Sequence, residues 1–425
     1  MSVLLISLGV FLILGIPIAY SLGLSSFLYF VIHHPELLPI LPQRLYAGMD
    51  SYAMIALPLF VLMGLLMNEG GITTRLIDFS LIFVGRLRGG LGAVNVLASM
   101  IFGGISGSSV SDTASIGAVL IPEMQKKGYS PEFASGITVA SSTMGMIIPP
   151  SVPMVIYAFV AEASVGKLFL GGVFPGIIIG FLMLGITLLV SLWKKYPREE
   201  VTLTKREVVD RIERAILALI MPIFVVGAVV TGMATATESA GIGALYAFGV
   251  GYFIFRGLKL RTIPRLLKVS ISTSAQVMII IALSKLYIWI LVIEHIPESV
   301  AGFVSGLDLP VFVILLIISA IILITGTFVD VSPAILLLTP VFLPAVTAVG
   351  VSPIQFGVIL ITGLAIGLVT PPVGMCLNVA SAISKLGIGT IFRAAVPFSL
   401  ANVITLILIT LVPPICMWLP RLLME

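Results

Sequence analysis

The sequence is poor in charged residues: Lys, Arg, Asp and Glu make up only 10% of its 425 residues, against roughly 25% in soluble domains. Such a chain has too little polar surface for an ordinary water-soluble fold. It has two cysteines, Cys376 and Cys416, and three histidines, too few for a disulfide framework or a structural zinc site. The net charge of +4 lies mostly in loops, and we expect no nucleic-acid partner.

The chain is instead rich in long apolar segments, with 59% hydrophobic residues and a mean hydropathy of +1.21. Segments such as 175–192 and 311–326 are long enough to cross a bilayer. They lack the alternation of barrel strands, and backbone groups in hydrocarbon must be satisfied within the segment, so the spans are predicted to be helices. The predicted fold class is an all-α, multi-pass membrane protein.

Basic residues gather in two loops, 193–214 and 256–268, which the positive-inside rule places in the cytoplasm. The helix pair 215–256 between them then runs out and back. Segment 91–125 has basic residues near both ends and a polar, glycine-rich centre. It is therefore predicted to be a re-entrant hairpin from the inside, and by the same reasoning 310–346 is a hairpin from the outside.

Each half of the chain contains about five further crossings. Because five is odd, the second half must be inverted relative to the first, giving inverted-topology repeats at 1–193 and 215–425 joined by a basic cytoplasmic linker, 194–214. Segments 69–88 and 257–272 have mixed polarity and are expected to lie along the membrane surface. The predicted crossings are 1–16, 17–32, 52–68, 131–162, 167–193, 215–233, 237–256, 273–293, 353–384 and 394–412.

One unusual motif occurs in both halves. The first copy reads Gly-Ile-Ser-Gly-Ser-Ser-Val-Ser-Asp at 104–112 and Met-Gly-Met-Ile-Ile-Pro-Pro at 144–150. The second reads Thr-Gly-Thr-Phe-Val-Asp at 325–330 and Ile-Gly-Leu-Val-Thr-Pro-Pro at 366–372. Matching the two aspartates places the copies about 218 residues apart, with ten residues from each Asp to a Pro. Matched interruptions of this kind are typical of a midplane binding site in a transporter.

The interruptions free oxygen atoms inside the membrane. Each Pro-Pro pair removes backbone donors and keeps the preceding residue out of the helical region, making 131–162 and 353–384 discontinuous helices. Freed carbonyls and hydroxyls suit Na⁺, and we predict one Na⁺ site per repeat. The alternative is a pair of structural kinks with Ser and Thr hydroxyls bonded back to the helix. The predicted Na⁺ residues are Ser106, Ser108, Ser109, Asp112, Gly145, Pro149, Thr325, Thr327, Asp330, Gly367 and Thr370.

Asp112 and Asp330 are intramembrane carboxylates, which cost at least about 2.5–3.5 kcal/mol to insert and mark function. The alternative role is capping the second arm of each hairpin. An intramembrane aspartyl protease would pair them as a dyad, but their equivalent places in a repeat predict two separate sites. A channel is another alternative, although two hairpins that enter the membrane from opposite sides suit alternating access better than a continuous pore. No catalytic residue is predicted, and we expect a transporter, not an enzyme.

The motifs at 103–112, 147–151 and 367–374 resemble those of the large membrane subunit of tripartite ATP-independent periplasmic (TRAP) transporters. The resemblance extends over essentially the whole chain. It implies a Na⁺-driven, elevator-type importer of organic acids in the bacterial inner membrane, with two or more Na⁺ ions. It also implies two partners: a separate small four-helix membrane subunit and a periplasmic substrate-binding protein.

The resemblance also assigns roles to residues. One Na⁺ would lie between the tip Ser106–Asp112 and the break Gly145–Pro150, and another between Thr325–Asp330 and Gly367–Pro372. The resemblance is closest to the sialic-acid branch, with C4-dicarboxylates as the alternative substrate. A stand-alone Na⁺/dicarboxylate or H⁺ transporter of similar architecture is the competing function. The substrate would lie between the two tips, at Ser108, Ser109, Pro150, Thr327, Pro372 and Asn378.

Overall fold

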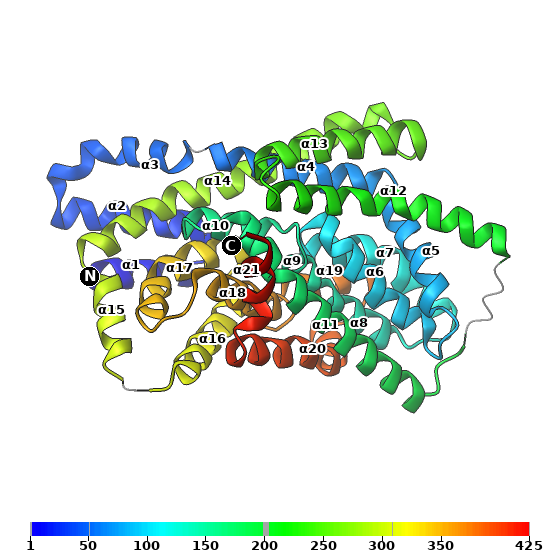
Figure 1. Cartoon of the computed structure of the whole chain (residues 1–425). Helices are drawn as coiled ribbons and strands as arrows, with labels where there is room; N and C mark the ends of the chain where they lie inside the picture. Colours follow the sequence, from blue (N-terminus) through cyan, green and yellow to red (C-terminus); the bar gives the residue numbers. More distant parts are fainter. Residues whose placement is uncertain (1, 51, 199–203, 308, 425) are drawn as a thin grey trace.

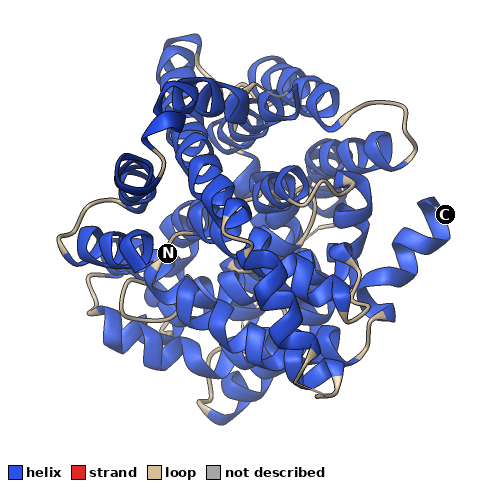
Figure 2. Ribbon diagram, turned by 90° about the vertical axis from the view of Figure 1, so that its left-hand side faces the viewer, coloured by secondary structure: helices blue, strands red, loops and turns tan. Residues whose placement is uncertain are grey.

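The computed structural model describes residues 2–50, 52–198, 204–307 and 309–424, which form helices joined by short connections (Figures 1 and 2). The first half contains α1 (Ser2–Ile13), α2 (Ile18–His33), η1 (Pro35–Ile40), α3 (Leu41–Met49), η2 (Tyr52–Ile55), α4 (Ala56–Glu69), α5 (Ile72–Val84), α6 (Gly90–Ser106), α7 (Ser109–Lys126), α8 (Pro131–Ser142), α9 (Met144–Ile147), α10 (Val152–Val160) and α11 (Val165–Trp193).

The second half contains α12 (Lys205–Val230), α13 (Ala236–Gly249), the π-helical turn η3 (Val250–Ile254), η4 (Leu260–Thr262), α14 (Ile263–Ile293), α15 (Ile296–Ser305), α16 (Val311–Phe328), α17 (Val331–Ala348), α18 (Pro353–Gly367), α19 (Met375–Ser384), α20 (Ile388–Leu411) and α21 (Pro414–Met424). Within the described ranges, the strand-like pairing is a single isolated bridge between Arg88 and Arg198.

The helices form two parts. Helices α3, α4, α12, α13 and α14 run along one side of the molecule, at the top of Figure 1, and the hairpins and broken helices form the body beneath them. Helices of the two halves of the chain pack on each other here. Helix α4 of the first half packs on α13 of the second half, and α14 of the second half packs on α2 of the first half. The end of α11 and the start of α12 lie toward the right-hand end of Figure 1, and α15 lies at the left-hand end.

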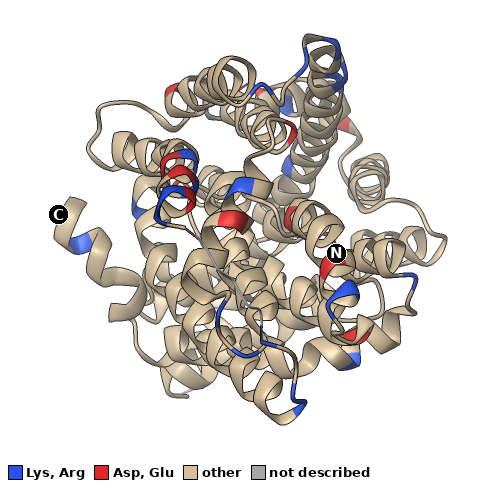
Figure 3. Ribbon diagram, turned by 90° about the vertical axis from the view of Figure 1, so that its right-hand side faces the viewer, with Lys and Arg blue, Asp and Glu red and all other residues tan. Residues whose placement is uncertain are grey.

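The length and apolar composition of the helices support membrane insertion. In the described residues, six helices are long and apolar enough to cross a bilayer, and two bent pairs bring the number to eight. Charged residues occupy little of the ribbon, as the view onto the end where α12 begins shows (Figure 3). The predicted crossings 1–16 and 17–32 correspond to α1 and α2, whose 12 and 16 residues are fewer than the roughly 20 of a full crossing.

Both predicted hairpins are present. Segment 91–125 forms α6 and α7, and segment 310–346 forms α16 and α17. The first hairpin turns at Gly107, whose φ of +62° suits a residue without a Cβ. In Figure 1 the α6–α7 hairpin lies toward the right-hand end and the α16–α17 hairpin toward the left-hand end, so the two enter from opposite sides.

Both predicted discontinuous helices are also present. Segment 131–162 is divided into α8, α9 and α10, and segment 353–384 into α18 and α19. Each begins at a Ser-Pro step: the hydroxyls of Ser130 and Ser352 accept hydrogen bonds from the backbone N–H groups of Phe133 and Ile354, both at 3.3 Å. In both breaks the Pro-Pro peptide bond is cis.

The structure corrects the register of the repeat. The two hairpins and broken helices align with a constant separation of 222 residues, not 218, from the hairpin tips to the Pro-Pro breaks. Asp330 is the N-cap of α17 and therefore matches Ser108, the N-cap of α7. Asp112 lies in the first turn of α7 and matches Ala334. The matched pairs include Ser108 and Asp330, Pro122 and Pro344, Gly128 and Gly350, Ser130 and Ser352, Gly145 and Gly367, and Pro149 and Pro371.

Two further expectations need correction. Residues 257–272 do not form a separate surface arm, because α14 is one continuous helix of 31 residues from Ile263 to Ile293. The linker 194–214 is shorter than predicted: α12 begins at Lys205, where Thr204 and Glu207 form a capping box. Residues 199–203 of that linker lie outside the described part of the chain. Residues 72–84 of the other expected arm form α5, bent by 67° from α4.

Candidate ion and substrate site

The tip of the first hairpin lies against the first break. A Cβ added to Gly103 would lie 3.0 Å from the Cα atom of Gly145, and one added to Gly104 would lie 2.9 Å from the carbonyl oxygen of Pro149. A Cβ on Gly107 would lie 3.2 Å from the Pro150 carbonyl oxygen. Glycines in α6 thus let the backbone of the tip approach the backbone of the break, bringing the predicted residues of this half together.

The carboxylate of Asp112 is at the centre of this first site. Its side chain is fully buried, with 0% exposed, and its Oδ1 atom accepts a short hydrogen bond from the hydroxyl of Ser106. Its Oδ2 atom has no hydrogen-bond partner, nor does the buried hydroxyl of Ser109. A Cβ on Gly145 would occupy the space against Oδ2. Unpaired buried oxygens are costly, so this arrangement suits a hard cation such as Na⁺.

A buried polar network supports the first site. In α6, the Asn95 amide donates to the Thr138 hydroxyl of α8 at 2.6 Å, and the Ser141 hydroxyl donates to Asn95 Oδ1 at 3.1 Å. Ser142 accepts from Thr113 of α7 at 2.8 Å. This network is absent from the sequence-based predictions, although polar residues at 135, 138, 141 and 142 of α8 have a helical spacing that indicates it.

The second tip lies against the second break in the same manner. A Cβ on Gly326 would lie 3.2 Å from the Cα atom of Gly367. The backbone N–H of Val373, directly after the Pro-Pro step, donates to the carbonyl oxygen of Thr327 at 3.3 Å. The structure therefore also brings together the predicted residues of the second half.

The polar groups of the second site differ from those of the first. The hydroxyls of Thr325, Thr327 and Thr370 each donate to a carbonyl three or four residues earlier in the chain at 2.8 Å, the arrangement described by the back-bonding alternative. Asp330 caps α17, with Oδ1 accepting from the Val331 N–H at 2.8 Å, and its side chain is exposed. The second site therefore has no buried unpaired carboxylate like that of Asp112.

The two sites lie side by side because each half packs on the other. Helix α7 packs on α19, and α17 packs on α10. The predicted substrate residues differ in exposure: Ser109 and Pro150 are buried, Ser108 and Thr327 are half-buried, and Pro372 and Asn378 are exposed. The Asn378 amide donates to the Val373 carbonyl at 2.8 Å and so fixes the second break.

Several helix ends point to this region. Helices α7, α10, α17 and α19 all begin at a tip or a break, and a helix N-terminus carries positive partial charge. The backbone N–H groups in their first turns suit an anionic ligand, although the Val331 N–H of α17 already donates to Asp330 and the Met154 N–H of α10 to the Ser151 hydroxyl. Across residues 2–50, 52–198, 204–307 and 309–424, no group of three His, Cys, Asp or Glu side chains could hold a metal ion. The chemistry available here is that of oxygen ligands and helix dipoles.

The fold and this site define a class: an all-α polytopic membrane protein with inverted-topology repeats, two re-entrant hairpins and two discontinuous helices that meet in one central region. The chain belongs to the family described as the DctM component of tripartite ATP-independent periplasmic transporters, whose model matches residues 5–415. Membership confirms the family indicated by the sequence motifs and places the chain in the bacterial inner membrane.

Individual relatives support this assignment. The chain is 37% identical, over 94% of both sequences, to the C4-dicarboxylate TRAP transporter large permease protein DctM of Pseudomonas aeruginosa. It is 34% identical to the sialic acid TRAP transporter large permease protein SiaM of Vibrio cholerae, over 96% of this chain and 95% of that protein. The fold is similar to the Alcanivorax borkumensis YdaH transporter, with a TM-score of 0.61, 14% identity and 89% and 88% coverage of the two chains.

Proposed function

We propose that this chain is the translocating subunit of a Na⁺-coupled importer of organic acids. It receives its substrate from a periplasmic binding protein and works with a small four-helix membrane subunit. The family description, a tripartite periplasmic transporter, supports the two partners. The chain binds two or more Na⁺ ions, one at each tip and break, and the substrate lies between the tips.

One observation carries the Na⁺ coupling: the buried Oδ2 atom of Asp112 and the buried hydroxyl of Ser109 both lack a partner beside the Pro-Pro break. A Na⁺ ion would satisfy both oxygens with carbonyls freed at Gly145 and Pro149. At the second site the ligands would be the Thr hydroxyl lone pairs and the freed carbonyls near Gly367. The ion lowers the cost of the buried carboxylate and holds the tip on the break.

The substrate proposal follows from the helix ends. Four half-helices begin at the central region and favour a carboxylate group there. C4-dicarboxylates and sialic acid, named for the two relatives, both carry carboxylates. The higher identity to the dicarboxylate permease gives no support for the sialic-acid branch over the other, and we propose the broader class of organic acids.

For transport, we propose an elevator movement. The hairpins and broken helices would move as one body against α4, α12, α13 and α14, because tip and break contacts hold that body together on both sides. Na⁺ and substrate binding would fix both tips and allow the loaded body to cross. Because the hairpins of the two halves enter the membrane from opposite sides, the same central site can open to each side of the membrane in turn.

Proton coupling is the competing proposal, because a protonated Asp112 would also satisfy the buried carboxylate. The decisive experiment is reconstituted uptake of organic acids with candidate membrane and periplasmic partners, under an imposed Na⁺ or H⁺ gradient. Uptake that needs all three proteins and the Na⁺ gradient supports the proposal. Uptake driven by a H⁺ gradient without Na⁺, or by this chain alone, contradicts it.

A further inference from the structure

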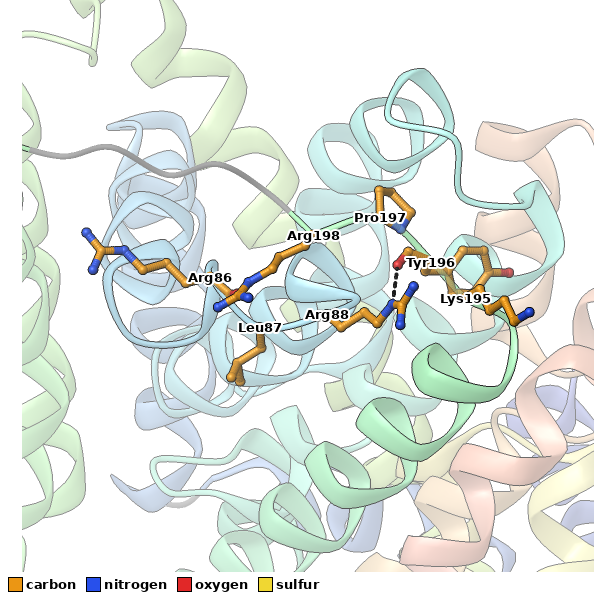
Figure 4. A pocket seen from close by; sticks show the side chains of 7 residues that line it. All are labelled: Arg86, Leu87, Arg88, Lys195, Tyr196, Pro197 and Arg198. Carbon is orange, nitrogen blue, oxygen red and sulfur yellow. Dashed lines mark hydrogen bonds between the residues drawn. The ribbon is translucent and has the colours of Figure 1, made fainter.

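A basic cavity lies at the end of the molecule that the basic loops mark as cytoplasmic. Its volume is about 420 Å³, and it lies between the α5–α6 loop and the segment that follows α11. Seven residues line it, four of them basic and none acidic: Arg86, Leu87, Arg88, Lys195, Tyr196, Pro197 and Arg198 (Figure 4).

The chain segments that line the cavity are held by aromatic packing and hydrogen bonds. The Tyr196 side chain is buried, its ring centroid lies 4.8 Å from that of Tyr129 and 4.6 Å from that of Phe133, and its hydroxyl hydrogen-bonds Ser130 at 2.9 Å. The Gly89 N–H donates to the Pro197 carbonyl at 3.1 Å. The two chain segments that line the cavity are therefore fixed to each other and to α8.

Two arginine side chains are held in place by hydrogen bonds that their Nε atoms donate. Arg198 Nε donates to the Arg86 carbonyl at 2.8 Å, and Arg88 Nε donates to the Tyr196 carbonyl at 3.3 Å. No carboxylate in the described chain pairs with Arg88, Lys195 or Arg198 within ion-pair distance. The terminal N–H groups of the two arginines thus stay available in a fixed orientation, which suits an oxyanion such as phosphate, and Lys195 adds a positive charge to the lining. Arg86 makes a further interaction of its own, so the anion is assigned to the other three basic residues.

Exposed apolar side chains lie close in the sequence to the residues that line the cavity. At the α11 end, Leu189, Leu192 and Trp193 expose 67%, 54% and 82% of their surface. On the facing segment, Phe83 and Leu87 expose 60% and 41%. A free phosphate ion would use only the basic groups. A phospholipid would use both features, with its headgroup in the cavity and its acyl chains along the exposed helix surfaces.

We propose that this cavity binds the phosphate headgroup of an anionic phospholipid from the inner leaflet. Arg88 and Arg198 bind the phosphate oxygens through their guanidinium groups, and Lys195 adds a third positive charge. The lipid thereby links the α5–α6 loop to the end of α11. This role lies outside the transport site and does not depend on the coupling ion.

The test uses the full chain purified in detergent and titrated with phosphatidylglycerol or phosphatidylcholine, with bound lipid counted by native mass spectrometry. The wild type is expected to prefer phosphatidylglycerol. Arg88→Gln with Arg198→Gln is expected to weaken phosphatidylglycerol binding by about tenfold or more, since each basic residue strengthens binding to an anionic lipid surface severalfold. Arg88→Lys with Arg198→Lys keeps the charge and should retain most of the binding.

The matched control is Lys259→Gln with Arg261→Gln, which removes two exposed charges from the other basic loop and should leave cavity binding unchanged. If the double glutamine variant does not fold, Lys195→Gln replaces it, with an expected loss of about fivefold. Equal losses in the cavity and control variants would overturn the proposal, as would equal binding of phosphatidylcholine. Complete displacement of the lipid by millimolar inorganic phosphate would assign the site to a free anion.

Discussion

The carboxylate of Asp112 lies directly against the backbone of Gly145, so that a Cβ atom at residue 145 would overlap Oδ2. Gly145 does not have a positive φ, so its backbone conformation does not require glycine. The requirement comes from the neighbouring hairpin. The break in the first discontinuous helix is thus shaped to accept the carboxylate of the hairpin tip, and this contact joins the two parts of the first site.

Gly145→Ala is expected to displace the Asp112 carboxylate and lower Na⁺-stimulated uptake by about tenfold or more. The added methyl group overpacks a buried site, which also costs about 1–3 kcal/mol of stability. Reconstituted uptake and thermal unfolding measure the two effects. Gly185→Ala is the control, since residue 185 has open space around its Cβ and alanine favours the helix. A Gly145→Ala variant with wild-type Na⁺ dependence would contradict the proposed role of this contact.

Asp112→Asn keeps the size of the side chain but removes its charge. Loss of a charged ligand is expected to raise the Na⁺ concentration for half-maximal uptake by at least about tenfold, corresponding to roughly 1.4 kcal/mol. A Na⁺ titration of uptake, or of thermal stability, measures this change. Glu123→Gln on the same helix is the control, because its ion pair with Lys126 is exposed and long, at 3.9 Å, and worth little. An unchanged Na⁺ titration in Asp112→Asn would exclude this carboxylate as a ligand.

The sequence was sufficient to predict the hairpins and the broken helices. The long apolar segments predict helices, and the Gly-rich tips and Pro-Pro breaks mark where those helices cannot continue. Residues 91–125 and 310–346 therefore appear in the structure nearly within their predicted limits. The limits of α12 and α14 were less predictable, because both helices continue from the apolar region into polar sequence.

The register of the repeat was not predictable from residue identity. Aligning Asp112 with Asp330 matched two identical residues, but the structure aligns Asp330 with Ser108 as helix N-caps. Serine and aspartate are both favoured at N-cap positions, so the position is retained while the residue differs, although only the Asp330 side chain accepts a capping hydrogen bond. The ten-residue spacing to a proline misled for a similar reason, since α17 contains both Pro340 and Pro344.

This register predicts different outcomes for two substitutions of Asp330. Asp330→Ser introduces the residue found at the matching position of the first hairpin, and its hydroxyl is expected to accept the hydrogen bond that Asp330 accepts from the Val331 N–H. Its stability should stay within about 0.5 kcal/mol of wild type, whereas Asp330→Ala should lose about 0.5–2 kcal/mol. Denaturant unfolding in detergent compares the two variants. Equal destabilisation by serine and alanine would show that capping is not the structural role of Asp330.

The buried network between α6 and α8 could not be predicted, because isolated Asn, Ser and Thr residues in a helix do not identify their partner helix. Asn95 connects the two helices through Thr138 and Ser141. A double-mutant cycle with Asn95→Ala and Thr138→Val is expected to give a coupling energy of about 0.6–1.7 kcal/mol, the range for interhelical hydrogen bonds in membranes. Thermal or denaturant unfolding of the four proteins measures it.

Thr347→Val is the matched control for this cycle. Thr347 is exposed, and its hydroxyl bonds only to carbonyls of its own helix, at 2.8 and 2.9 Å. Paired with Asn95→Ala, it should show no coupling, because effects of distant and independent sites add. Coupling near zero for Asn95 and Thr138 would mean that the network does not hold α6 to α8. The position of the first tip over its break would then depend on its other contacts, those of Gly103, Gly104 and Gly107 and that of Asp112 with Gly145.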